Sequence, residues 1–345
     1  MKLSRAYVEC VGCGEAGCPL DERLGIEGSA SREAERLMCL VSTGWGFALA
    51  SQRLKDLLGW TCSGNTLRQT CYRRGVQMAQ WRESQPEALS HFRHAQGDVE
   101  FETDGTCINT TAGWKEMRLG IFAKRHRGQP ATIENWDQRA LPRPHARLAL
   151  AAMESSRRFG RRWRPCARRL GIFDASQLTV LGDGAKWIWE EKIKHLRGSE
   201  GVLDVFHALE HVHRTSEALF GERNPAAATW ADQAKDALLR GGWRGIDEHL
   251  SQTRAETRSP RKRKMLQKLV NYLAPHADHL NYPERMAAGR TIGSGLVEGG
   301  CKQIIGRRLK QTGARWRPKN ANHMATLCST AYSDHWDTFW NPPIN

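Results

Sequence analysis

The stretch Leu178–Trp189, which reads LTVLGDGAKWIW, constrains the fold of this chain more than any other. Leu178, Val180 and Leu181 form an apolar, partly β-branched run that predicts a buried strand. The glycines on either side of Asp183 allow a sharp turn that leaves the carboxylate exposed at the strand end, and a helix is expected to follow. Asp183 is then either an ordinary turn or capping residue, or a functional carboxylate.

Charge and length narrow the class of partner. The 345 residues suggest two or three domains, and 52 Lys and Arg against 37 Asp and Glu give a net charge of +15. Such an excess favours a polyanionic partner, most simply nucleic acid, over a membrane surface. No run approaches the roughly 18 apolar residues that span a bilayer, and the start lacks the apolar core of a signal peptide. We therefore expect a cytoplasmic protein.

Ten cysteines are scattered along the chain, and in a reducing compartment most are expected to be small core residues. The exception is the head, residues 1–28, where Cys10 and Cys13 stand at metal-ligand spacing and Cys18 follows. A structural zinc site needs four ligands, and Cys39 is distant for that task. A partial zinc knuckle and a head without metal both remain open.

Residues 29–97 have helical periodicity throughout. A helix over Phe47–Leu58, a short turn and a basic helix over Thr66–Trp81 are the parts of a helix-turn-helix DNA-binding region. The second helix carries Arg68, Arg73 and Arg74. A small helical bundle with solvated arginines is the alternative.

From Asp98 the pattern changes to alternation. Residues 98–108 and 114–126 predict a β-hairpin with Asp104 near the middle of its first strand. A short strand is expected over Ala131–Trp136 and a basic helix over Ala146–Leu170. A strand over Gly201–His207 follows the helix from Lys186, so it should lie parallel to the Leu178 strand.

This order of elements predicts an α/β chain with an RNase H-like core, a mixed sheet with flanking helices. The core is expected over residues 98–207 and 291–332, interrupted by an all-helical insertion over residues 208–290 and followed by a tail, residues 333–345. Helices are expected over Ala208–Phe220 and, within the insertion, over Pro225–Arg240, Trp243–Arg254 and Pro260–Ala274.

Three carboxylates stand in distinctive settings. Asp104 lies on the first strand, Asp183 at the end of a later strand, and Glu298 opens the last helix among glycines. Cleavage or transfer of a phosphodiester by two metal ions needs oxygen ligands of this kind converging on one point. The three residues are therefore the candidate catalytic and metal-binding triad.

The runs FETDGT, LGDGAKWIW, VLDVFHALEH and IGSGLVEGGCKQIIGRRLKQTGARW resemble the DDE transposases of bacterial insertion sequences, and most closely the ISKra-type family, a relative of the Mutator-like enzymes. The resemblance spans residues 98–332. It implies that Asp104, Asp183 and Glu298 bind two Mg²⁺ or Mn²⁺ ions in an RNase H-like fold. It also implies cleavage and strand transfer of double-stranded DNA at terminal repeats and target, by a homodimer or larger assembly on the bacterial nucleoid.

The DVFH run resembles a signature that follows the second aspartate in Mutator-like enzymes. Asp204 and His207 are accordingly either a local helix cap or residues at the edge of the site. Trp187 and Trp189 are core anchors or, alternatively, a wedge that stacks on a base. The predicted phosphate contacts are Lys186, Lys302, Arg307, Arg308, Lys310 and Arg315.

Two other functions remain open. A sequence-specific DNA-binding regulator would use the helix-turn-helix and leave the carboxylates with structural roles only. An RNase H-like nuclease would hydrolyse DNA without joining strands.

Overall fold

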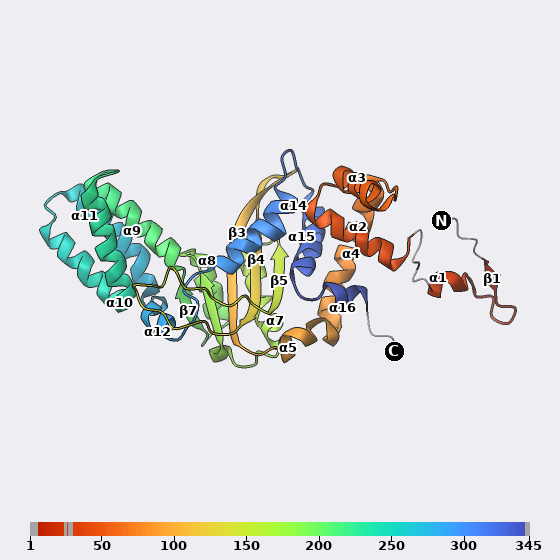
Figure 1. Cartoon of the computed structure of the whole chain (residues 1–345), viewed down its shortest axis with the longest axis horizontal. Coiled ribbons are helices and arrows are strands. Elements are labelled where there is room, and N and C mark those ends of the chain that lie inside the picture. The colour runs from red at the N-terminus through yellow and green to blue at the C-terminus, as the bar shows by residue number, and fades with distance from the viewer. Residues whose placement is uncertain (1–5, 24–25, 27–29, 342–345) are drawn as a thin grey trace.

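The computed structural model describes residues 6–23, 26 and 30–341. It is an α/β chain in which, within those residues, a five-stranded mixed sheet stands between two groups of helices (Figure 1). The strands are β3 (Asp98–Thr110), β4 (Gly113–Arg125), β5 (Ala146–Ala152), β6 (Leu178–Gly182) and β7 (Glu200–Leu203).

The strand order in the sheet is β5-β4-β3-β6-β7. β4 is antiparallel to both β3 and β5, whereas β6 pairs parallel with β3 and β7 pairs parallel with β6. The predicted hairpin and the predicted parallel neighbours are therefore both confirmed. β3 is central and extends beyond its pairing with β6, so the carboxyl ends of β6 and β7 lie beside the middle of β3; we call this side the carboxyl edge.

Helices cover both faces of the sheet. On one face, α6 (Ser156–Gly160) and α7 (Trp163–Arg169) bury Phe159 and Trp163 against Phe101 and Phe122. On the other face lie α13 (Gly295–Gly300), the π-helical turn η4 (Cys301–Gly306), α14 (Arg307–Leu309) and α15 (Pro318–Tyr332). The short 3-10 turn η2 (Ala175–Gln177) leads into β6, and the helix α8 (Lys186–His195) follows the strand.

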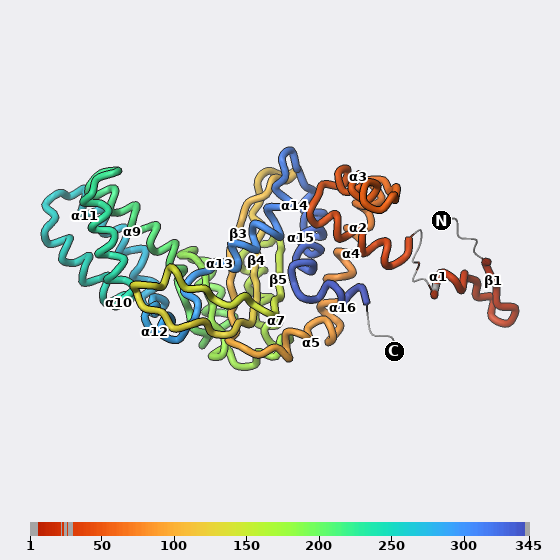
Figure 2. Tube along the Cα trace, viewed as in Figure 1, coloured from red at the N-terminus to blue at the C-terminus, as the bar shows by residue number. Residues whose placement is uncertain are grey.

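Residues 205–287 are helical, in agreement with the prediction. This group comprises α9 (Val205–Phe220), α10 (Pro225–Glu256), α11 (Pro260–Leu273), η3 (Ala274–His279) and α12 (Tyr282–Ala287). The two helices expected from Pro225 to Arg254 form a single element with a kink at Gly242, whose φ is 54°. This group extends away from the β7 side of the sheet (Figure 2).

The N-terminal helices pack beyond the opposite side of the sheet. They are α1 (Pro19–Arg23), α2 (Arg32–Gly44), α3 (Phe47–Leu58), α4 (Gly64–Ser84), η1 (Pro86–Leu89) and α5 (Ser90–His94). The head adds the hairpin β1 (Val8–Glu9) and β2 (Ala16–Gly17), and α16 (Trp336–Trp340) ends the described chain. Part of the predicted head, residues 1–5, 24–25 and 27–28, lies outside the described residues.

The predicted recognition helix is only partly free. α4 packs on α15, where the carbonyl of His323 approaches Gly75 so closely that a Cβ there would lie 2.4 Å away. Arg74 is buried and pairs with Glu35 at 2.5 Å, so its guanidinium is not available to a phosphate group. Arg68 stays exposed on the outer face.

Three local predictions are wrong. Residues 146–152, the start of the basic helix expected over Ala146–Leu170, form β5, since pairing with β4 outweighs helix propensity. No strand forms over residues 131–136, which make a turn instead. The strand expected over residues 201–207 ends at Leu203, because Asp204 caps the helix that begins at Val205.

All ten cysteines are free thiols, as expected, but only four of them are buried, so the prediction that most are core residues is wrong; the four are Cys39, Cys62, Cys71 and Cys328. Among the helices of the described residues, none combines the length and the apolar character needed to cross a membrane.

Candidate active site at the carboxyl edge of the sheet

The strand register aligns three aspartates at the carboxyl edge. Glu102 of β3 pairs with Leu181 of β6, and two residues further along each strand come Asp104 and Asp183, which therefore lie level with each other. Gly182 of β6 pairs with Leu203 of β7, and the next residue on each strand is Asp183 and Asp204, respectively. Two of these residues were predicted as ligands, and the third was predicted at the edge of the site.

Asp104 is partly buried, and one of its carboxylate oxygens, Oδ1, accepts a hydrogen bond from the Gly105 amide at 2.6 Å. Burial and the negative charges of Asp183 and Glu298 raise the pKa of Asp104 above its ordinary value. The three predicted ligands are therefore close enough to repel one another electrostatically.

Asp183 owes its position to the residues that follow it. Its Oδ1 accepts a hydrogen bond from the Ala185 amide at 2.9 Å, and its carbonyl accepts one from the Trp189 indole at 2.8 Å. Gly184 has to be small, because a Cβ there would lie 2.2 Å from the ring of Tyr272 in α11. Trp189 is buried and stacks on His279, so it is a core anchor that also fixes the backbone of Asp183.

Glu298 reaches the site from α13, which lies directly on the sheet. At Gly300 a Cβ would come within 2.5 Å of Ile121 and 3.0 Å of Leu119, so only glycine allows this approach. At the start of the helix, the Val297 amide donates to Glu102 at 2.9 Å. Among the glycines around Glu298, Gly300 is in close contact with the sheet, whereas a Cβ at Gly295 or Gly299 would meet nothing within 4 Å.

Asp204 is both a helix cap and a member of the site. It is fully buried, and it accepts hydrogen bonds from the His207 amide at 2.8 Å and from the Ser294 amide and hydroxyl at 2.5 and 2.8 Å. Burial alone would raise the pKa of Asp204, but the hydrogen bonds from His207 and Ser294 lower it. Both carboxylate oxygens of Asp204 thus already accept hydrogen bonds, which suits a residue that orients His207 and Ser294 better than a metal ligand.

His207 is a cationic side chain that faces the carboxylates, and its charge acts on Asp104. Its Nδ1 lies 3.0 Å from Asp204, and this hydrogen bond raises the pKa of His207 to about 9. One ligand atom from each of Asp204, His207 and Glu298 lies within 4.8 Å of the others. The two interpretations of the DVFH run therefore hold together: the residues cap α9 and also border the site.

Asp104, Asp183 and Glu298 form no ion pair with a lysine or arginine in the described part of the chain. Each also keeps at least one carboxylate oxygen without a hydrogen bond from a nitrogen or hydroxyl donor there. Carboxylate oxygens without a lysine or arginine partner are donors that Mg²⁺ and Mn²⁺ prefer. The chemistry of the three residues therefore fits a divalent cation. Within the described residues, however, the group whose ligand atoms all lie within 4.8 Å of one another is Asp204, His207 and Glu298, and it contains neither Asp104 nor Asp183.

The predicted DNA contacts separate into two groups. Lys186, Lys302, Arg307, Lys310 and Arg315 are exposed. Arg308 is a wrong prediction, because its side chain is buried, donates to the Ser42 carbonyl at 2.6 Å and lies over the rings of Phe47 and Trp316. Periodicity could have indicated this, since Ile304, Ile305 and Leu309 face the same way.

Two other predicted residues have structural environments that limit their roles. Trp187 is partly buried between Trp163 and the guanidinium of Arg118, which lies 5.1 Å from its ring. In the head, the thiols of Cys10 and Cys13 are exposed on a tight turn, and hydrogen bonds from the Cys13 and Gly12 amides lower the pKa of Cys10. Among the described residues, no cluster with metal-binding geometry includes these cysteines.

Sequence reasoning missed Glu102. It lies on the same face of β3 as Asp104, fully buried, and burial together with the charge of Glu100 raises its pKa to about 8. The signal was present, because Glu100, Glu102 and Asp104 alternate along one strand and so must share a face.

No protein-family model matches this chain, and no curated protein matches it either.

Proposed function

We propose that this protein is a DNA transposase of the DDE type, which cleaves DNA at the ends of an insertion sequence and joins the ends to target DNA. One observation carries the proposal: Asp104 from the middle of β3, Asp183 from the end of β6 and Glu298 from a helix share a site without a lysine or arginine partner in the described residues. A catalytic site for phosphoryl transfer needs unneutralised carboxylates of this kind.

The sheet supports an RNase H-like core. Along the chain the sheet is made of three antiparallel strands, β3, β4 and β5, followed by the parallel strands β6 and β7. If these five are renumbered 1 to 5 in chain order, their order across the sheet is 3-2-1-4-5. Residues 205–287 would then be a helical insertion between β7 and the helix that carries Glu298. The resemblance of the sequence motifs to ISKra-type transposases agrees with this assignment.

The proposed chemistry divides between the bound ions and the protein. Two Mg²⁺ or Mn²⁺ ions would supply activation of the attacking oxygen and stabilisation of the leaving oxygen. Asp104, Asp183 and Glu298 would hold them, and Asp204 would orient His207 beside the site through Nδ1. The protonated His207 would face the negative charge of the scissile phosphate at neutral pH, since its pKa is about 9.

The exposed basic residues that follow Glu298 would hold the phosphate backbone near the site. Lys302, Arg307, Lys310 and Arg315 lie on one segment with Glu298, and the overall charge of +15 supports a polyanionic substrate. With bacterial DNA as substrate, the protein would act in the cytoplasm.

The decisive experiment incubates the purified chain with DNA from both flanks of its own coding region, with Mg²⁺ or Mn²⁺. We expect nicking at the element ends and joined products, both lost on chelation. Asp104→Asn, Asp183→Asn and Glu298→Gln should each lower cleavage by at least about 10³-fold while DNA binding survives. Asp98→Asn, at the other end of the same strand, is the matched control and should retain cleavage.

The same experiment separates the alternatives. Binding that is indifferent to divalent cations, with no cleavage by the wild-type chain, would support a regulator and exclude the enzyme. Cleavage without joined products would support a nuclease.

A further inference from the structure

Glu102 connects the strand of Asp104 to the helix of Glu298. Its Oε2 accepts a hydrogen bond from the Val297 amide at 2.9 Å, and Val297 directly precedes Glu298. On its own strand, Glu102 lies two residues before Asp104 and points to the same face of the sheet. One side chain thus joins the neighbours of two proposed ligands that are far apart in the sequence.

We propose that Glu102 is a positioning residue, whose carboxyl group sets the separation between Asp104 and Glu298 for metal binding. The inference rests on the proposed function, because it assigns a role within that site. Glu102 itself need touch neither the metal nor DNA.

Stability does not account for an acid at this position. Glu102 is completely buried, and its second oxygen, Oε1, has no hydrogen-bond partner in the described residues. Burying a carboxyl group with one oxygen unsatisfied costs free energy that an apolar side chain would avoid. A residue retained at such a cost in a core position is expected to serve something other than packing.

Glu100 shows the contrast on the same strand and face. It is also buried, but Arg125 lies 3.1 Å from its carboxylate, so its charge is neutralised locally. Glu100 lies two residues further from the carboxyl edge, and its carboxylate accepts a hydrogen bond from Arg125 of β4 rather than from α13. The two glutamates therefore match in residue type, in the face of the strand and in burial, but Glu102 contacts α13 whereas Glu100 contacts Arg125.

A second contact restricts α13 in the same way. The backbone of Gly300 lies against Ile121, the residue that pairs with Glu102 across the β3–β4 ladder. The helix is thus held at its start by Glu102 and at its end by close packing. Loss of the first contact would free the turn that carries Glu298 while the far end stays in place. Misplacement of a ligand by a fraction of an ångström is enough to weaken a metal site.

The test measures Mn²⁺ affinity of the full chain by titration calorimetry, with thermal unfolding as a check on folding. Glu102→Met removes the acceptor and keeps the length of the side chain, and we expect it to weaken Mn²⁺ binding by about 10- to 100-fold. Glu102→Gln keeps an acceptor for the Val297 amide and should stay within about 3-fold of wild type. Glu100→Met, the matched control, should lower the melting temperature but leave Mn²⁺ affinity unchanged.

If Glu102→Met does not fold, Glu102→Asp replaces it, since it keeps the acid but withdraws it by one methylene, and it should weaken binding similarly. Wild-type affinity in a folded Met or Asp variant would overturn the inference, as would an equal loss in Glu100→Met. Failure of the wild-type chain to bind Mn²⁺ would instead overturn the proposed function, and the inference with it.

Discussion

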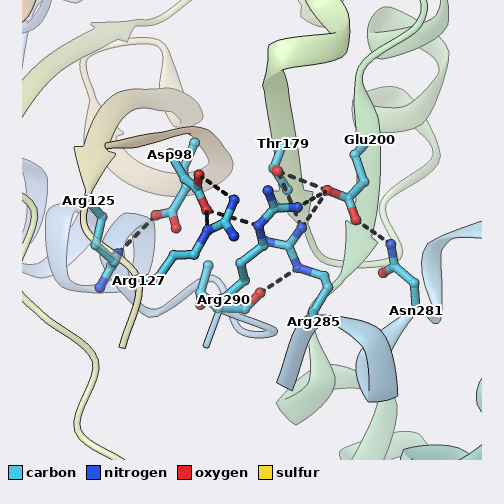
Figure 3. Close-up of polar contacts among 10 residues, drawn as sticks. Asp98, Arg125, Arg127, Thr179, Glu200, Asn281, Arg285 and Arg290 are labelled. Atoms are coloured by element: carbon cyan, nitrogen blue, oxygen red, sulfur yellow. Dashed lines mark hydrogen bonds and ion pairs between the residues drawn. The ribbon is translucent and has the colours of Figure 1, made fainter. Parts of the chain in front are cut away.

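In the part of the chain that the structure describes, acidic side chains are paired with arginines at one edge of the sheet and lack such partners at the opposite edge. At the amino edge, where β3, β6 and β7 begin, Asp98 and Glu200 are surrounded by guanidinium groups (Figure 3). Arg127 and Arg290 donate to Asp98 at 3.0 and 2.9 Å, and Arg285 donates to Glu200 at 2.6 Å.

At the carboxyl edge of the same strands, Asp104 and Asp183 have no such partners in the described residues, and His207 is a cation that faces them. The amino edge is built for stability, because its charges are already compensated. At the carboxyl edge the negative charges of Asp104 and Asp183 are not neutralised by lysine or arginine in the described residues. The difference supports placing the proposed site at the carboxyl edge, although both edges are rich in acids.

The largest expected effect lies at the amino edge. Arg285→Met removes a buried guanidinium that also donates to the Thr291 carbonyl at 2.8 Å, and it should destabilise the chain by about 3 kcal/mol in denaturant unfolding. Arg127→Met, whose side chain is 54% exposed and whose partner Asp98 keeps Arg290, should leave the free energy of unfolding nearly unchanged. Equal losses of unfolding free energy in the two variants would mean that the buried guanidinium does not contribute more stability than the exposed one.

The sharpest comparison uses two aspartates on one strand. Without divalent cations, Asp104→Asn should unfold at an equal or higher denaturant concentration than wild type, because it relieves repulsion, whereas Asp98→Asn should unfold earlier. With Mn²⁺ at about 100 times its dissociation constant, wild type and Asp98→Asn should each gain about 2.7 kcal/mol. Asp104→Asn should gain nothing. A gain in Asp104→Asn would place the ion elsewhere.

A smaller effect concerns the helix that brings Glu298 to this edge. Gly300→Ala places a methyl group against Ile121 and should cost about 1–3 kcal/mol, less any gain in helix propensity. Gly299→Ala, where a Cβ meets nothing within 4 Å, should be neutral or stabilising by up to about 1 kcal/mol. Melting temperatures of the two variants decide the matter, and an unharmed Gly300→Ala would show that α13 has room to move.

The effect that solvent screening reduces most is a dependence on pH at the carboxyl edge, because the His207 side chain is 37% exposed. Because the folded pKa of His207 is raised to about 9 from 6.5, the native state holds this proton more tightly than the unfolded chain. The stabilisation is complete below pH 6.5 and is lost as the pH rises to about 9. In chelator, wild type should lose stability across this window relative to His207→Gln. Arg285→Met should keep the wild-type slope, since arginine stays charged throughout.

Local sequence patterns predicted much of the fold. Alternation marked β3 and β4, and the apolar run before Asp183 marked β6, because burial on one or both faces leaves a periodic signal. β5 was missed since ARLALAA has the composition of a helix, and only the neighbouring strand decides its conformation.

The candidate site was predictable for a different reason. Asp104, Asp183 and Glu298 could be named from motifs and their resemblance to a family, and the strand register explains why two of them meet. The support around them could not be named, because Glu102 and Arg308 acquire their roles only through contacts with distant segments.

The helix after Glu298 has one more consequence. Helical backbone runs without a break from Gly295 through the π-helical turn to Leu309, so Glu298 and Arg308 sit near opposite ends of one rod roughly 15 Å apart. Arg308 is fastened to the end of α2 through the Ser42 carbonyl. If the rod moves as one body, a ligand that favours one placement of α2 would change the affinity for an ion at Glu298, and by linkage an ion bound there would change the affinity for that ligand by the same factor.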